Sequence, residues 1–198
     1  TDIAIGVAAL MGFILPINFN SPYKADSVGN FWKRWHISLS SWLKDYLYIP
    51  LGGNRGGTIG TWVVLSIIVL FVSALAANLW IFIGYIGFSL LIVALAKMIP
   101  AFKDWLTTNI NIMLTMLIGG LWHGASWNFV IWGALHGVYL GVNHAWRSWR
   151  GDKISHGAWA RGGSRLLTFL AVILAWVFFR ASSIDSALNI ISGMLGMS

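Results

Sequence analysis

The 198-residue sequence contains no cysteine, which excludes disulfides, a thiol nucleophile and cysteine-ligated metal sites. Glutamate is absent too, and all six acidic residues are aspartates. Charged residues make up 10% of the chain, whereas soluble domains usually carry about 25%. With 58% hydrophobic residues, the composition is that of a protein whose main solvent is not water.

Two long segments, residues 56–96 and 105–146, contain no Asp, Glu, Lys or Arg. A membrane-crossing helix needs about 20 apolar residues, so each segment has room for two crossings. The sequence therefore predicts an all-α, multi-pass transmembrane protein. It shows no repeat and no linker, and we expect residues 1–198 to belong to a single domain.

The cations carry the formal net charge of +7, but they do not form the soluble basic face that a nucleic-acid-binding protein needs. They flank the apolar segments in three blocks: Lys24 to Arg55, Lys97 with Lys103, and Arg147 to Arg165. Even numbers of crossings between the blocks would place all three on the cytoplasmic side. We expect a membrane lipid environment and no nucleic-acid partner.

Apolar runs and their breaks predict the following helices. They cover residues 3–15 (ending before Pro16), 31–49, 60–77, 79–96 (after a turn near Asn78), 106–118, 128–145 and 164–182, with a basic loop at 147–165. In the 128–145 segment Gly133, Gly137 and Gly141 recur every four residues, a pattern that lets membrane helices pack closely.

Residues 31–49, "FWKRWHISLSSWLKDYLYI", project as one amphipathic helix. Trp32, Trp35, Leu39 and Trp42 share one arc, and the basic and hydroxyl residues share the other. Such a helix suits the membrane interface. His36 projects to the edge of the apolar arc, where it either faces a cavity or caps one.

The segment "GGLWHGASW" at 119–127 places His123 among three glycines that weaken a helix. Ionisable residues at membrane depth are functional candidates, and irregular backbone there is tolerated only inside protein or around a wet cavity. We predict a broken intramembrane helix at this point, with His123 beside a polar cavity. From composition alone, a chemical role and a structural or gating role both stay open.

The other histidines have plainer interpretations. His136 lies in a regular helix and is expected to pack by hydrogen bonding to a neighbouring helix, while His144 and His156 are expected in loops at the membrane edge. No metal site is predicted, because His123 and His136 are 13 residues apart without a carboxylate between them. A Gly-x-Ser-x-Gly elbow is missing, and "GGNRGG" lacks the Lys-Ser/Thr of a phosphate loop.

Three longer motifs, "NFNSPY", "FWKRWHISLSSWLKDYLYIPLGGNRGG" and "GGLWHGASWNFVIWGALHG", together with "WVFFRASSIDSAL" near the end, resemble the membrane-bound O-acyltransferases. The similarity is to the bacterial branch of alginate O-acetyltransferase-like proteins. It implies that His123, in the Trp-His-Gly motif, is catalytic and that His36, in the Arg-Trp-His motif, is the second important histidine. Trp122, Asn128 and Arg34 are weaker candidates for lining the substrate cavity.

The resemblance implies acyl transfer, by default of acetyl, across the bacterial cytoplasmic (inner) membrane. The donor would be a co-substrate such as acetyl-CoA or another acyl carrier, with no bound cofactor. The acceptor would be a hydroxyl of an exported polysaccharide or a secreted acyltransferase-like partner protein. Two alternatives stay open: a polysaccharide export component, and a non-catalytic scaffold for a periplasmic modifying enzyme.

Two departures from the family pattern are expected. Residues 58–105 are longer than the link expected between the two main motifs and add an apolar pair of helices. The chain also reads as part of a family member, without its N-terminal and last C-terminal helices.

Overall fold

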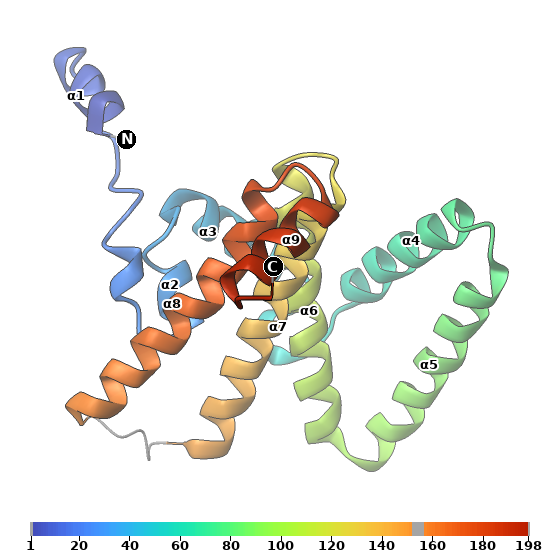
Figure 1. The fold of residues 1–198 in the computed structure, drawn as a ribbon. Coiled ribbons are helices and arrows are strands. Elements are labelled where there is room, and N and C mark those ends of the chain that lie inside the picture. Colours follow the sequence, from blue (N-terminus) through green and yellow to red (C-terminus); the bar gives the residue numbers. More distant parts are fainter. Residues whose placement is uncertain (1, 152–156, 198) are drawn as a thin grey trace.

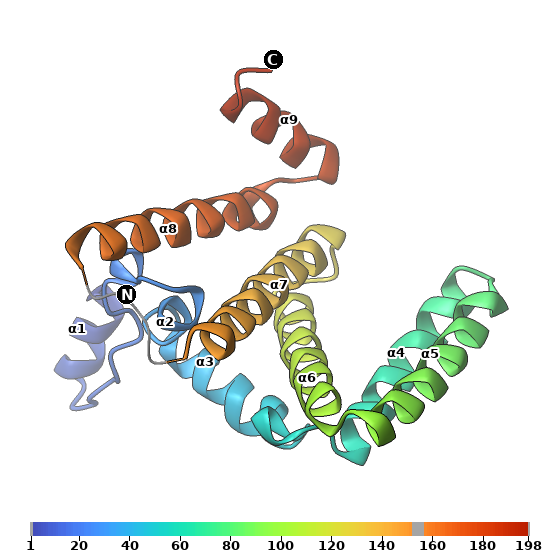
Figure 2. The same cartoon turned by 90° about the horizontal axis from the view of Figure 1, so that it is seen from below.

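The computed structural model describes residues 2–151 and 157–197, and this part of the chain contains helices and no strand, as the all-α prediction requires. The longer helices are α1 Asp2–Leu10, α4 Ile59–Leu75, α5 Leu79–Met98, α6 Pro100–Trp122, α7 Trp127–Arg150, α8 Ala158–Arg180 and α9 Ile184–Met194. Helices α6 and α7 lie between α8 and the α4–α5 pair, which stands out to one side (Figures 1 and 2).

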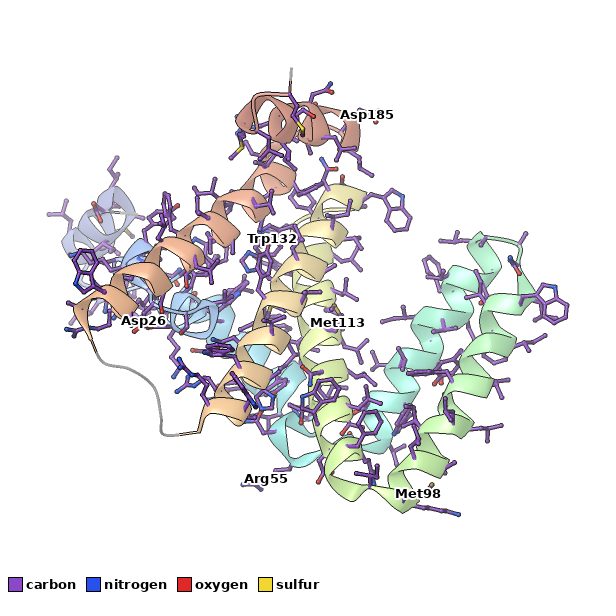
Figure 3. The ribbon with its side chains drawn as sticks, turned by 60° about the horizontal axis from the view of Figure 1, so that its bottom comes forward. Asp26, Arg55, Met98, Met113, Trp132 and Asp185 are labelled. Atoms are coloured by element: carbon purple, nitrogen blue, oxygen red, sulfur yellow. The ribbon has the colours of Figure 1, made fainter. Side chains whose placement is uncertain are left out.

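Helices α6 and α7 form an antiparallel pair whose close approach depends on glycine (Figure 3). A Cβ atom on Gly133 would lie 2.4 Å from the Met116 carbonyl oxygen, and one on Gly137 would lie 2.8 Å from the Met113 sulfur. On the other helix, a Cβ on Gly120 would lie 2.3 Å from the Phe129 carbonyl oxygen. These contacts confirm that the glycine pattern of the sequence serves helix packing.

The predicted weakening of the helix at residues 119–120 is wrong. Both glycines remain helical and α6 continues to Trp122. Leu43 and the Phe129 carbonyl approach so closely that a Cβ at either glycine would be crowded. The chain then reverses over residues 123–126. The Ser126 side chain accepts a hydrogen bond from the backbone N–H of Asn128 and so caps the start of α7.

The single amphipathic helix predicted over residues 31–49 is also wrong. The structure divides it into α2 Val28–Trp32, a turn, α3 Ile37–Leu43 and a π-helical turn, η2 Lys44–Tyr48. The division occurs because Asn18 holds the start of α3: its carbonyl accepts from the Ile37 amide, and its side chain accepts from the Ser38 amide at 2.9 Å.

The predicted helices around Asn78 are confirmed, since α4 ends and α5 begins on either side of it. The glycine-rich loop "GGNRGG" precedes α4. Thr61 of α4 bonds to the residue just before this loop, since its hydroxyl donates to the Leu51 carbonyl at 2.6 Å. The hydroxyl also lies 2.9 Å from the Asn111 side-chain oxygen. The Asn111 side-chain amide donates to the Gly53 carbonyl at 3.3 Å, so these contacts tie the loop to α4 and α6.

Several helix ends differ from the sequence prediction. Helix α1 ends at Leu10 because the chain turns at Gly12, where φ is +83°. Helix α7 extends to Arg150, so His144 is a helical residue and not a loop residue. Helix α8 begins at Ala158, within the predicted loop, and α9 was not expected. His156 lies outside the described residues.

Within the described residues, α8 is the one helix that is by itself long and apolar enough to cross a membrane. The segment Ile37–Arg55 and the helix Ile59–Leu75 pass the same test together, with a bend of 116° between them. Figure 1 shows the α5–α6 connection, the end of α7 and the start of α8 at the lower edge, and the α4–α5 and α6–α7 turns at the upper edge. The basic residues near 97–103 and 147–150 therefore gather at one end of the molecule.

Candidate functional site

His123 lies at the point where α6 ends, surrounded by aromatic rings. Its ring centroid is 4.9 Å from Phe179, 5.0 Å from Trp122 and 5.3 Å from Trp132, all edge-on. The Nε2 atom is buried and has no hydrogen-bond partner. A buried polar atom without a partner is uncommon, and here it leaves the imidazole free to bond to a substrate.

His36, the second histidine of the site, also contacts Trp122. The centroid of the Trp122 ring is 6.4 Å from His36 and 5.0 Å from His123. His36 has φ +48°, a left-handed conformation that costs a non-glycine residue energy. Its Nδ1 atom is buried without a partner. Together with Ser38, Leu39, Trp42 and Trp122, His36 lines a cavity of about 310 Å³, which we name the His36 cavity.

A second and larger cavity of about 630 Å³ lies between α2, α3, α6 and α7. Its lining includes four basic residues: Lys33, Lys44, His144 and Arg147. No acidic residue is among the described residues that line it. We name it the basic cavity. Lys33, Lys44 and Arg147 are exposed, which places the mouth at the end of the molecule that carries the basic residues.

The floor of the basic cavity is apolar and belongs to the aromatic core. Trp32 and Met116 are 7% and 8% exposed, and both pack in the cluster that contains Trp132. From Trp32 to Trp132 the ring centroids are 5.8 Å apart, and Trp132 in turn contacts His123. Two indoles therefore separate the basic cavity from the histidine, and His123 itself lines neither of the two cavities.

His136 is fully buried, and its Nδ1 accepts a hydrogen bond of 3.2 Å from the Trp32 indole N–H. The prediction of a packing histidine bonded to a neighbouring helix is confirmed, since Trp32 belongs to α2. The other imidazole nitrogen, Nε2, has no partner.

Arg34 and Asn128 lie apart from both cavities. The Arg34 Nε donates to Asn30 at 2.9 Å, and the Asn30 amide donates to Asp26 at 2.9 Å, which lowers the pKa of that carboxyl. Asn128 is 3% exposed, and its side-chain amide donates a hydrogen bond of 2.8 Å to the Ala181 carbonyl. This bond joins the start of α7 to the end of α8.

The structure thus brings three of the five predicted site residues together, His36, Trp122 and His123. It adds residues that the sequence reasoning did not select, above all Trp32, Trp132 and Phe179 around the histidines and Lys33, Lys44 and Arg147 at the cavity mouth. The three-residue spacing of Trp32 and Trp35 is the signal that could have pointed to Trp32. No sequence signal pairs Trp132 or Phe179 with His123.

Comparison with known proteins matches residues 1–109, more than half of the chain, to the family model described as MBOAT, membrane-bound O-acyltransferase family. The chain belongs to the membrane-bound O-acyltransferase family. This family membership confirms the resemblance stated from the motifs.

Three relatives show the range of this similarity. A peptidoglycan O-acetyltransferase of Helicobacter pylori is 40% identical over 99% of this chain and 28% of its own length. A probable alginate O-acetylase of Azotobacter vinelandii is 37% identical over 98% of this chain and 28% of its own length. A teichoic acid D-alanyltransferase of Streptococcus thermophilus is 27% identical over 89% of this chain and 35% of its own length.

The chain therefore spans just over a quarter of the length of the first two of these relatives. The matched region includes residues 58–105, the apolar segment that forms α4 and α5, because the two matches cover 98–99% of the chain.

Proposed function

We propose that the protein is an O-acyltransferase that moves an acyl group, acetyl by similarity to its relatives, from a cytoplasmic thioester to a hydroxyl group. The observation that carries the proposal is the position of His123. Its unpartnered Nε2 lies in a cluster whose outer members, Trp32 on one side and Trp122 on the other, line two different cavities.

The basic cavity suits the donor. Its volume is in the range of about 300–1,000 Å³ found for small-molecule sites. Lysine and arginine at the mouth favour phosphates, while the apolar floor favours the acyl end. Acetyl-CoA, or another acyl carrier with a phosphate group, fits this division between a charged mouth and an apolar floor.

The His36 cavity suits the acceptor. It contacts the catalytic candidate through Trp122 and contains the unpartnered Nδ1 of His36, which can bond to a hydroxyl. The acceptor proposed is a hydroxyl of an exported polysaccharide or of a secreted acyltransferase-like partner protein.

For the reaction, the thioester has to pass the Trp32 and Trp132 indoles, which separate the basic cavity from His123. The Nε2 atom of a neutral His123 then accepts the proton of the acceptor hydroxyl while the oxygen attacks the thioester carbon. A new C–O bond forms, the C–S bond breaks, and the imidazolium returns the proton to the leaving thiolate. General base catalysis of this kind contributes typically about 10²–10⁴ in rate. The aromatic surroundings exclude water and so limit hydrolysis of the thioester.

The proposed location is the bacterial cytoplasmic membrane, with several crossings and the basic end of the molecule in the cytoplasm. The family description, the basic residues gathered at one end and the long apolar helices support this proposal.

The test is the His123→Ala variant in the full-length protein. We expect transfer to fall by about 10²-fold or more, with the amount of protein in the membrane unchanged. Mass spectrometry of the cell-surface polymer measures acylation, and immunoblotting of membranes measures insertion. Wild-type acylation in this variant would contradict the assignment, and export of unmodified polymer that depends on the protein would favour the transport alternative.

A further inference from the structure

A third cavity, of about 430 Å³, lies between α2, α7 and α8, and the proposed acyl transfer makes no use of it. We name it the α7–α8 cavity. The two helices separate toward their lower ends in both views, and the cavity lies in that half of the pair (Figures 1 and 2). Its lining runs from Tyr139 to Trp146 on α7 and from Ser164 to Ala171 on α8, about 10 Å along each helix.

The α7–α8 cavity has a polar mouth and an apolar side. Asp26 and Ser164 at the mouth are exposed, whereas Thr168 farther inside is buried. Two other lining residues, Val142 and Leu167, are 63% and 71% exposed, so the cavity is open sideways onto an apolar surface. A site for a water-soluble molecule would open to water alone. The sideways opening suits a ligand that lies in the bilayer.

The mouth carries an anion and a cation that do not pair with each other. The Asn30 side chain bonds to Oδ1 of Asp26 and is the main cause of the lowered pKa of that carboxyl, to which the charge of Arg165 contributes. Arg165 is exposed on α8, next to Ser164, and no ion pair joins these two described residues, Asp26 and Arg165. A ligand that has both a positive and a negative group would satisfy both of them.

The level of the cavity matches that of lipid headgroups. Trp146 at the mouth is half exposed, and the Arg150 guanidinium lies 5.0 Å from the centroid of its ring. Tryptophan and arginine are typical of the membrane interface, which in the proposed orientation is the cytoplasmic one. Deeper inside, the Tyr139 hydroxyl is buried without a hydrogen-bond partner, so it is free to bond to an ester oxygen of a lipid.

We propose that the α7–α8 cavity binds the headgroup of phosphatidylethanolamine from the cytoplasmic leaflet. The ammonium bonds to Asp26, the phosphate lies beside Arg165, and an acyl chain passes between Val142 and Leu167. A primary ammonium has three N–H donors for a carboxylate and its neighbours, whereas choline has none and phosphatidylglycerol has no cation. Of the proposed function, this inference uses only the orientation in the membrane.

The experiment is native mass spectrometry of the full-length protein in detergent. Dioleoyl phosphatidylethanolamine, phosphatidylcholine and phosphatidylglycerol are added separately at equal concentrations. We expect phosphatidylethanolamine to bind more tightly than either of the others by about fivefold, the upper range for an exposed charge pair. No acyl donor is present, so this result and the test of acyl transfer can fail independently of each other.

Matched variants assign the preference to the two charged residues. Asp26→Asn keeps an oxygen that accepts from Asn30 but removes the charge, and it should abolish the preference for phosphatidylethanolamine. Asp185→Asn is its control, because Asp185 is an exposed acid of α9 away from this cavity (Figure 3). Arg165→Gln should weaken the binding of all three lipids, since each has a phosphate, while Arg161→Gln, one turn earlier on α8, should not.

Melting temperatures in lipid-free detergent establish that the variants are folded, and Asp26→Ser provides the same measurement if Asp26→Asn is not recovered. Equal binding of the three lipids overturns the inference. Tighter binding of phosphatidylglycerol overturns it too, because the basic end would then attract anionic lipid in general. A preference that persists without the Asp26 charge, or that Asp185→Asn abolishes equally, also overturns it.

Discussion

The His123 imidazole is surrounded by aromatic rings, and its buried Nε2 has no hydrogen-bond partner. Among the described residues, four aromatic side chains have centroids within 6.0 Å of its imidazole: Trp122, Phe129, Trp132 and Phe179. They come from α6, α7 and α8, so three helices must dock before the histidine is placed. This explains why a short motif at 119–127 predicted which residue is the candidate but not what surrounds it.

Asn128 illustrates the opposite case, a polar residue whose place in a motif suggested a substrate contact. Its amide is bonded to the Ala181 carbonyl, and a sequence cannot show which buried carbonyl will lie opposite. We expect Asn128→Ala to lower the free energy of unfolding by about 1–3 kcal/mol, because the partly buried Ala181 carbonyl loses its hydrogen-bond donor.

Thermal unfolding in detergent measures this loss. Asn189→Ala is the control, since Asn189 is an exposed residue of α9 and its substitution should change stability little. A melting temperature of Asn128→Ala equal to that of the control would contradict the structural role.

At the scale of elements, the α6–α7 pair depends on the absence of side chains at a few positions. Gly133→Ala would place a methyl group 2.4 Å from a backbone oxygen of α6, which the neighbouring helix can relieve only by moving away. We expect a loss of about 1–3 kcal/mol in the free energy of unfolding, the usual cost of overpacking.

Gly84→Ala on α5 is the matched control, because a Cβ at Gly84 meets nothing within 4 Å. There the substitution should be neutral or stabilise by up to about 1 kcal/mol through helix propensity. Both variants are compared by thermal unfolding in the same detergent, and equal melting temperatures would argue against glycine-dependent packing.

Periodicity predicted the existence of most helices but not the division of residues 31–49. The apolar residues Trp32, Trp35 and Leu39 are buried, and the backbone at residues 33–36, between α2 and α3, is not helical. The cause is Asn18, a residue from a distant turn that bonds to the amides of Ile37 and Ser38. Such tertiary contacts overrule a local pattern, and they cannot be seen in the pattern itself.

At the scale of the whole molecule, the distribution of charge predicts the orientation in the membrane. The basic connections around 97–103 and 147–150 lie at one end, and the turn at Asn78 lies at the other (Figure 1). The positive-inside rule then predicts that Lys103 and Arg150 face the cytoplasm and Asn78 faces outward.

The absence of native cysteine from this chain makes the prediction direct to check, because an introduced cysteine is its only thiol. A membrane-impermeant maleimide should label Asn78→Cys in intact spheroplasts. It should label Lys103→Cys and Arg150→Cys only in inside-out vesicles. Labelling of all three from one side would contradict the orientation.

Helix α3 lies between the basic cavity and the His36 cavity. Ser40 and Leu43 face the basic cavity, while Leu39 and Trp42 face the His36 cavity. A displacement of this short helix would change the volumes of both cavities at once. If filling one cavity displaces α3, the affinity of the other cavity changes, and thermodynamic linkage requires the influence to be equal in both directions.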